Sequence, residues 1–402
     1  MKINWTNISQ QDFLENYWQK QPIVLKHAIP NFIDVISADE LAGIAMEEFI
    51  DSRLISNSNN QWQVSHGPFE HFEDLPETNW SLLVQGVDNF FASVADLKSL
   101  VDFLPKWRID DVMISFSTKD AGVGAHLDQY DVFIIQGHGK RRWQAGSVDQ
   151  NLKQSEVSKD LLQLDGFEAI IDEVLEPGDI IYIPPFSPHK GVTIEPCLNY
   201  SIGFRAPSAK ELMSEFADFA LDHDLGNKRY QTNDYYVNPG KLNSSAGSNT
   251  SSLLSSNETQ ALKQMLHSLI DSEDVFDHFI NEHLTKPTRE LDINEQAITV
   301  DELIQTLEQP DTVIRKTLGL RSSSLTTGEN ILFFCHGEEF LCHPQQIEFI
   351  KILENNDKLT EKDLKSFEYW LENIQLVTRL INYGYWFIDN KDNDNGLQDT
   401  QG

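Results

Sequence analysis

The sequence EPGDIIYIPP, at residues 176–185, is the stretch that decides the fold of this chain. Its first part, Pro177–Asp179, has the composition of a turn, and the strongly apolar run Ile180–Ile183 that follows is typical of a strand. The two prolines at 184–185 end that strand, because proline has no N–H group to donate to a sheet. The pattern predicts a strand that places His189 just beyond its end, at the rim of a barrel.

His126 and Asp128 precede this strand in the sequence, and their side chains can act together with that of His189. They stand two positions apart, so in an extended segment both side chains leave the same face. A His-x-Asp pair alone is more often a surface or strand-end pair. With the later histidine it becomes a two-histidine, one-carboxylate set, which holds a divalent metal and leaves other positions open. We therefore predict His126, Asp128 and His189 as metal ligands and as the catalytic centre of a non-haem Fe(II) oxygenase.

Three longer segments carry a family resemblance, and they read DDVMISFS at 110–117, GVGAHLDQYDVF at 122–133 and NYSIGFRAP at 199–207. They resemble the JmjC-type ribosomal oxygenases, and more narrowly the bacterial branch that hydroxylates C3 of an arginine in large-subunit ribosomal protein sixteen. The resemblance is dense from about Trp5 to Pro207. In the rest of the chain only the order of regions matches.

The resemblance implies 2-oxoglutarate as co-substrate, together with O2 and Fe(II), and it implies a cation for the distal carboxylate. A planar guanidinium suits that carboxylate. Alternation along KRRW at 140–143 separates Arg141 from its two basic neighbours, which are expected to face solvent. By its place in the family motif, Arg141 is the predicted anchor. Asn199 and Ser201 share one face of the closing strand and either line the pocket or make structural hydrogen bonds.

An arginine substrate needs acidic and hydrogen-bonding groups around its guanidinium, because a buried unpaired cation is costly. The candidates near the ligand segment are Asp110, Asp111, Tyr130 and Asp131. Each by itself is more often a solvent-facing or structural residue. As a set they predict an acidic mouth to the pocket.

The composition of the whole chain is strongly acidic. It has 31 Lys and Arg against 63 Asp and Glu, a formal net charge of -32. Such a chain should repel bare nucleic acid and attract a basic ribosomal protein. Acidity is also a general route to solubility, so the charge favours this partner only modestly.

The chain has 402 residues, more than one hydrophobic core usually organises, so two or three domains are expected. The predicted fold class is α+β. Residues 1–207 alternate strands with glycine and proline turns, which predicts a double-stranded β-helix, the jelly roll of the cupin and JmjC kind, as catalytic domain. A helical region, a winged-helix-like domain and an acidic, disordered tail are predicted at 208–298, 299–389 and 390–402. The resemblance assigns the helical region to homodimerisation.

The third region is predicted to contain a hairpin at Ile331–His343 that turns on Gly337, then helices at Pro344–Asn355 and Glu361–Asn373. That order resembles a winged helix, which makes DNA binding the obvious rival function. Residues 299–402 carry 9 Lys and Arg against 18 Asp and Glu, whereas a protein that reads DNA needs a basic recognition face. We therefore expect a protein-contact or scaffold role, with no direct nucleic-acid binding.

The odd number of cysteines (Cys197, Cys335 and Cys342) and the lack of a secretory leader predict a reducing, cytoplasmic setting. In the predicted hairpin Cys335 pairs with Phe340 and Cys342 with Phe333, so the two Cys-His dipeptides do not converge on zinc. No apolar run approaches the roughly 18 residues of a membrane span. The other histidines are expected to be structural or surface residues, although His138 is near enough to the site to check: His27, His66, His71, His138, His223, His267, His278 and His283.

Three functions from different classes are compatible with these residues. The first is the 2-oxoglutarate oxygenase that acts on a ribosomal protein arginine. The second is an oxygenase that acts on histidine or lysine of another basic protein, or a cupin that uses the metal for other chemistry. The third is a non-catalytic regulator with a metal-sensing barrel and a winged-helix reader, which the intact triad and Arg141 disfavour.

Overall fold

A computed structural model describes residues 1–58, 61–148, 150, 152–158, 161–231, 256–309 and 311–389. The predicted tail at 390–402 lies outside these residues. The chain forms two compact units. The first contains Met1–Ala206, Pro287–Glu295 and Lys316–Leu320, and the second contains the other segments from Pro207 onward. In the described residues no helix is long and apolar enough to cross a membrane.

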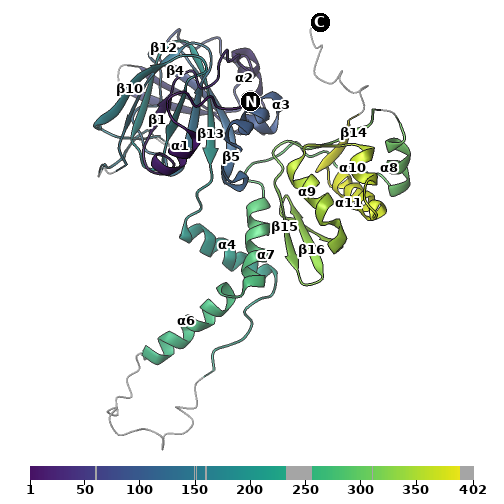
Figure 1. The fold of residues 1–402 in the computed structure, drawn as a ribbon. Helices are drawn as coiled ribbons and strands as arrows, with labels where there is room; N and C mark the ends of the chain where they lie inside the picture. The colour runs from purple at the N-terminus through teal and green to yellow at the C-terminus, as the bar shows by residue number, and fades with distance from the viewer. Residues whose placement is uncertain are drawn as a thin grey trace, which may run out of the picture. The chain divides into compact units, whose positions relative to one another are not determined.

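The first unit is built on two antiparallel sheets (Figure 1). The larger sheet has the order β1 (Ile23–Leu25), β11 (Ile180–Ile183), β6 (Val132–Gln136), β13 (Cys197–Phe204), β5 (Ile109–Ser117), β4 (Trp80–Val84), β2 (Ser52–Ser58) and β3 (Gln61–His66). The smaller sheet has the order β10 (Ala169–Leu175), β7 (Lys140–Gly146) and β12 (His189–Glu195). A short ribbon pairs β8 (Ser155–Ser158) with β9 (Leu161–Gln163). The jelly-roll fold predicted from the sequence is confirmed.

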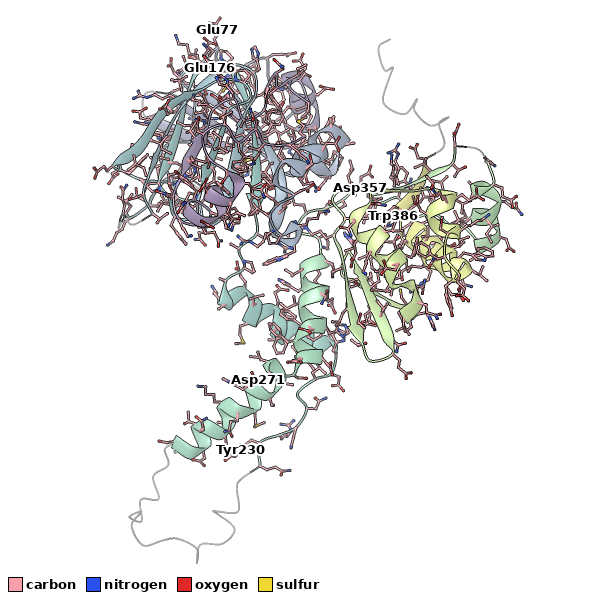
Figure 2. All side chains as sticks on the ribbon, in the orientation of Figure 1. Glu77, Glu176, Tyr230, Asp271, Asp357 and Trp386 are labelled. Atoms are coloured by element: carbon pink, nitrogen blue, oxygen red, sulfur yellow. The ribbon has the colours of Figure 1, made fainter. Side chains whose placement is uncertain are left out.

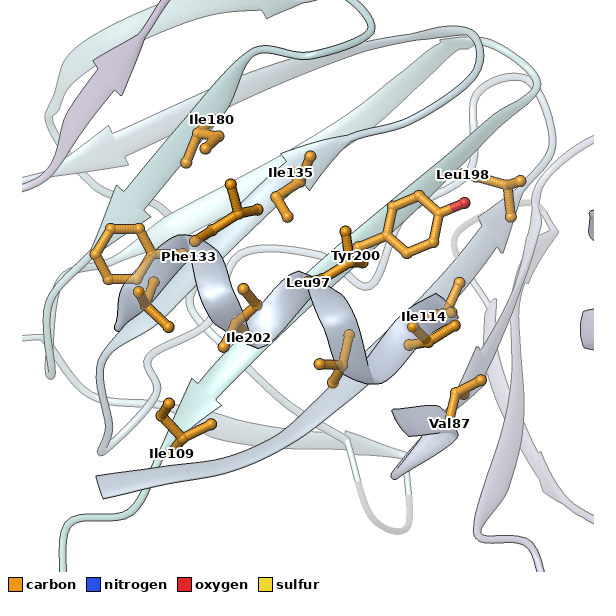
Figure 3. Packing of buried hydrophobic residues seen from close by; sticks show 14 of the residues in the cluster. Val87, Leu97, Ile109, Ile114, Phe133, Ile135, Ile180, Leu198, Tyr200 and Ile202 are labelled. Atoms are coloured by element: carbon orange, nitrogen blue, oxygen red, sulfur yellow. The ribbon is translucent and has the colours of Figure 1, made fainter. Parts of the chain in front are cut away.

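The central strands β6 and β11 of the large sheet are buried on both faces, which explains their continuous apolar runs. In β6, Val132 and Ile134 pack in one cluster with Trp143 and Ile181, whereas Phe133 and Ile135 pack in another. The second cluster also contains Ile180, Tyr200 and Ile202, and the short N-terminal helices pack on it. Figure 3 shows the strand residues of this cluster together with Leu97. Strand register is thereby fixed, because a slip of one residue would exchange the two clusters.

Short helices of the first unit cover the outer face of the large sheet. They are α1 (Gln10–Asn16), α2 (Ala38–Ile44), α3 (Ala92–Ala95) and the 3-10 turns at Val87–Asn89, Asp96–Val101 and Lys106–Arg108. Ser9 and Asp12 form a reciprocal capping box at the start of α1, and Phe13 is fully buried beneath it. The ring of Phe13 lies 4.9 Å from that of Tyr182 on β11, so the helix layer packs directly on the strand that precedes His189.

Among its described residues, the second unit begins with the helices α4 (Ala209–Asp222), α6 (Ser256–Ile270) and α7 (Glu273–Thr285). It continues with α8 (Val300–Leu307), β14 (Val313–Lys316), the sheet β15 (Ser322–Thr327), β16 (Asn330–Cys335) and β17 (Glu338–Cys342), a 3-10 turn (Pro344–Gln346), α9 (Ile347–Asn355), β18 (Lys358–Leu359), α10 (Glu361–Lys365), α11 (Trp370–Asn382) and β19 (Trp386–Asp389). Trp386, labelled in Figure 2, is fully buried within this C-terminal part. The order of elements confirms the winged-helix-like prediction.

Two details of that prediction are wrong. Cys335 pairs with Glu338 and Cys342 with Ile331. His336 and Gly337 both have positive φ and make a two-residue turn, whereas the predicted pairing of Cys335 with Phe340 requires a longer one. The single helix predicted at Glu361–Asn373 is two helices. The break between α10 and α11 lets Phe367 pack against Phe349, with ring centroids 6.1 Å apart.

Candidate metal centre

The three predicted ligands are brought together at one end of the barrel. His126 and His189 form an isolated antiparallel bridge, in which each backbone N–H donates to the other's carbonyl at 3.0 and 3.1 Å. The N–H of Phe186 donates to the carbonyl of Asp128 at 2.7 Å, which fixes the loop that follows β11. The prolines at 184–185 therefore end the strand where the chain must turn to reach His189.

The side-chain atoms of the triad face one another. Asp128 Oδ2 lies 3.4 Å from Nε2 of His189 and 3.8 Å from Nε2 of His126, and the two ring centroids are 4.1 Å apart. Nδ1 of His126 lies 3.1 Å from the carbonyl of Gly124, and Nδ1 of His189 lies 3.0 Å from that of Ser187. A carbonyl accepts only from N–H, so each Nδ1 is the protonated nitrogen. Both Nε2 lone pairs are left for a metal.

The electrostatics of the triad also suit a metal. Burial and the neighbouring His189 lower the pKa of His126 to about 4, against the opposing charge of Asp128. Burial alone would raise the pKa of Asp128, but His126 and His189 outweigh it and lower the pKa to about 2. At neutral pH His126 is therefore a neutral imidazole and Asp128 is an ionised carboxylate. These are the protonation states that bind a divalent cation.

Arg141 is a buried cation that lines the same cavity as the triad. Its NH1 donates to Oδ1 of Asn199 at 3.1 Å, its guanidinium carbon lies 4.9 Å from the ring centroid of Trp143, and burial lowers its pKa. Its Nε is buried and makes no hydrogen bond with any described residue. A Cβ at Gly191 would stand 2.5 Å from that Nε, so glycine keeps room beside the guanidinium. A cation with an unused donor fits the distal carboxylate of 2-oxoglutarate.

The neighbours of Arg141 have the predicted arrangement. Lys140 is paired with Glu176 at 2.9 Å and Arg142 with Asp172 at 2.6 Å, outside the barrel. Asn199, besides accepting from Arg141, donates to Oε1 of Gln136 at 2.8 Å, and it lines the cavity together with Ser201. Asn199 thus both orients the guanidinium and is held in place itself. His138 is exposed and is not a lining residue.

The cavity that contains the triad and Arg141 has a volume of about 420 Å³. Three of the four residues predicted to contact a substrate line this cavity, and we call them its mouth: Asp110, Asp111 and Tyr130. Asp111 is buried, and its Oδ2 accepts from the N–H of Gly86 at 2.8 Å. The charge of Asp128, followed by burial, raises the pKa of Tyr130, so its phenol stays protonated and able to donate.

Asp131 does not line the cavity, and the prediction that it contacts a substrate is wrong. It is fully buried behind the cavity. The hydroxyl of Tyr182 donates to it at 2.5 Å, and NH2 of Arg108 lies 2.9 Å away. The physical reason is alternation: Asp131 directly precedes β6 and shares the side of Phe133, which packs on the outer layer.

Arg289 is a residue of the site that sequence reasoning missed. It lines the cavity, with NH1 3.5 Å from Oδ2 of Asp110 and NH2 3.3 Å from Oδ2 of Asp111. Thr288 beside it donates to Oδ1 of Asp110 at 3.4 Å. The segment Pro287–Glu295 belongs to the first unit although it follows the helical region in sequence. No local pattern marks a residue that reaches the barrel from so far along the chain.

Comparisons with known proteins agree with this geometry. A family model described as the JmjC domain matches residues 96–212, and one described as the ROXA-like winged helix matches residues 265–387. The ribosomal protein uL16 3-hydroxylase of Escherichia coli is 44% identical over 391 residues, which cover 97% of this chain and 99% of that protein. The chain belongs to this family of JmjC ribosomal oxygenases.

Other members of the family support the assignment. A probable ribosomal oxygenase of Haemophilus influenzae is 30% identical over 313 residues, 75% of each chain. The structure of YcfD, a ribosomal oxygenase from E. coli, in complex with cobalt and 2-oxoglutarate is 42% identical, with a TM-score of 0.83 over 97% of this chain and 99% of that one. The family resemblance stated from the sequence is confirmed.

Proposed function

We propose that this chain is an Fe(II)- and 2-oxoglutarate-dependent oxygenase that hydroxylates C3 of an arginine in ribosomal protein uL16, in the cytoplasm. The observation that carries the proposal is the convergence of two imidazoles and one carboxylate on a cavity that also holds a buried arginine. With iron bound, the centre supplies the oxidative decarboxylation of 2-oxoglutarate by O2, to succinate and CO2, and the insertion of one oxygen atom into a C–H bond.

The protein's own residues perform the positioning. His126, Asp128 and His189 hold the metal with their two Nε2 atoms and one carboxylate oxygen. Arg141 binds the distal carboxylate of 2-oxoglutarate, and Asn199 keeps the guanidinium turned toward the cavity. The inner cluster of the barrel, with Ile134 and Trp143 among its members, excludes water from the reacting atoms.

An arginine target is supported by the chemistry of the mouth. Asp110 and Asp111 both face the guanidinium of Arg289, at 3.3 to 3.5 Å. A carboxylate has about four lone-pair sites, so Arg289 does not exhaust the capacity of the two carboxylates to accept from a second guanidinium. Tyr130 adds a phenol at the same mouth. A histidine target would leave these two carboxylates with less to bind.

Mass spectrometry of ribosomal protein uL16, or of its peptides, tests the proposal directly. The purified chain is incubated with Fe(II), 2-oxoglutarate and ascorbate. We expect a gain of one oxygen atom on an arginine, which fragmentation places at C3. Turnover of 2-oxoglutarate without this modification would retain the oxygenase and reject the target, and modification of a histidine or lysine would support the rival substrate class.

Binding of the target should depend on pH through Asp111. Burial, with the neighbouring charges of Asp88 and Asp110, raises the pKa of Asp111 to about 6, against the opposing charge of Arg289. Its carboxylate therefore attracts the target guanidinium above about pH 6 and loses its charge below it. We expect KM for an arginine peptide to rise about tenfold between pH 6.5 and pH 5 at saturating 2-oxoglutarate.

The variant Asp111→Asn provides the control for this pH dependence. Its KM should be high and nearly constant over the same pH range, since asparagine does not titrate there. Steady-state hydroxylation measured by mass spectrometry gives both profiles. If Asp111→Asn kept the wild-type dependence on pH, another group would be responsible and Asp111 would not contact the target.

We also propose that the helices of the second unit form a homodimer interface. Large apolar side chains are exposed on two of them: Met213 and Leu221 on α4, and Leu262 and Leu266 on α6. Leu221 and Leu266 are 78% and 66% exposed, which is unfavourable in an isolated chain. A second copy of the chain would cover them.

The double variant Leu221→Glu/Leu266→Glu should dissociate the dimer. Each new carboxylate would be buried without a partner in the interface, a large cost, whereas it is solvated in the monomer. Light scattering coupled to size-exclusion chromatography measures the mass. The variant Ile170→Glu, at a 56% exposed position on β10, is the matched control and should keep the wild-type mass. An unchanged mass for the double variant would place the interface elsewhere.

A further inference from the structure

A second group of metal-ligating side chains lies in the second unit, where His223, His278 and Glu282 each offer one ligand atom. The three atoms all lie within 4.8 Å of one another. His278 and Glu282 are four residues apart on α7, so their side chains share one helix face. His223 directly follows α4, which packs beside α7 (Figure 1). Donors from two helices therefore meet at one point.

We propose that this cluster binds a zinc ion. Two histidines and one glutamate are a ligand set that Zn(II) accepts in proteins. Nε2 of His223 and Oε2 of Glu282 are hydrogen-bonded at 2.9 Å, and a bound ion would replace this hydrogen bond after a small separation of the two atoms. Nε2 of His278 is buried and makes no hydrogen bond with any described residue. A buried nitrogen without a hydrogen bond is unfavourable, and a metal bond removes that cost.

Two further side chains lie beside the cluster. Oε2 of Glu339 on β17 lies 2.9 Å from Nε2 of His278, outside hydrogen-bonding geometry; it is not one of the three converging donors, so water would supply the fourth ligand. Nζ of Lys286 lies 3.0 Å from Oε1 of Glu282, the oxygen that does not face His223. Ligating carboxylates are commonly held in this way, with one oxygen on the metal and the other on a neighbouring donor.

Aromatic packing fixes the two imidazole rings. The ring centroid of Phe219 on α4 lies 4.2 Å from that of His223 and 5.5 Å from that of His278. Phe334 on β16 lies 5.3 Å from His278 on the other side. Phe219 itself is buried in the cluster that joins α4 and α7. A zinc ion here would tie the end of α4 to α7 within the second unit.

This site is separate from the proposed oxygenase centre, since none of its residues belongs to the first unit. The zinc site is therefore detected as metal that still binds after the ligands of the oxygenase centre have been substituted. The full-length double variant His126→Ala/Asp128→Ala is dialysed against Zn(II), and bound metal is determined by mass spectrometry. We expect two zinc ions per wild-type chain and one per chain of the double variant. Co(II) in place of zinc should give the intense visible absorption of a four-coordinate ion.

Adding Glu282→Gln to the double variant should weaken the remaining site about tenfold or more, because glutamine keeps the size but not the charge of the ligand. His223→Gln, at a solvent-accessible position beyond the end of α4, is a second test less prone to disturb folding. The matched control His267→Ala, which removes an exposed histidine of α6, should leave the affinity unchanged. The proposal is overturned if the double variant binds no zinc, or if its zinc is retained equally in both ligand variants.

Discussion

Arginine hydroxylation is expected to fall by about a thousandfold or more when Asp128 is replaced by alanine. The carboxylate is the only anionic group of the triad, with Oδ2 at 3.4 and 3.8 Å from the two Nε2 atoms. Without it, two imidazoles remain, and neither their number nor their charge suits a hard divalent cation. The rate of oxygen addition to an arginine peptide, measured by mass spectrometry at several Fe(II) concentrations, checks the expectation.

The control for Asp128→Ala is Asp172→Ala, which removes an equally charged residue from the outer side of β10, where it pairs with Arg142. That variant should retain the wild-type rate. Circular dichroism of both variants verifies the fold. Should Asp128→Ala keep more than about a tenth of the rate at saturating iron, the assignment of this carboxylate as a ligand would be wrong.

KM for 2-oxoglutarate is expected to rise about thirtyfold or more in Arg141→Met. Removing one partner of a buried ion pair costs about 2–5 kcal/mol, and the lower value corresponds to about thirtyfold. Methionine fills similar space without charge. Arg141→Lys keeps the charge but loses the planar fork, so its KM should lie between those of the wild type and the methionine variant. Succinate release measured against 2-oxoglutarate concentration gives these constants.

The matched control is Arg142→Met, next in sequence but outside the barrel, and its KM should equal the wild-type value. A thermal melt without 2-oxoglutarate shows whether Arg141 stabilises the fold, separately from its role in binding the co-substrate. In the ligand-free protein Arg141 is a buried cation with an unused donor, so Arg141→Met should melt at the same temperature or higher. A lower melting temperature with an unchanged KM would make Arg141 a structural residue instead of a co-substrate anchor.

Local patterns explain the parts of the fold that the sequence predicted. The turn and apolar run that lead into β11 predicted the strand before His189, and alternation along β7 separated Arg141 from Lys140 and Arg142. Both patterns arise because side chains of a strand alternate between two environments, so they are readable within a few residues. The spacing of His126 and Asp128 has the same origin. Such patterns fix which face a residue occupies.

Only the tertiary structure decided which partners the residues on one face of a strand contact. Asp131 was predicted for the substrate mouth, but the outer layer closes over it, and Tyr182 and Arg108 satisfy its carboxylate. Arg289 reaches Asp110 and Asp111 from a distant segment. The sequence by itself determined the jelly roll and pointed to the proposed metal ligands and the proposed anchor Arg141, because each follows from short-range alternation or a family motif. Partners far apart in the chain are chosen by packing and by the cost of burying charge, which no local window contains.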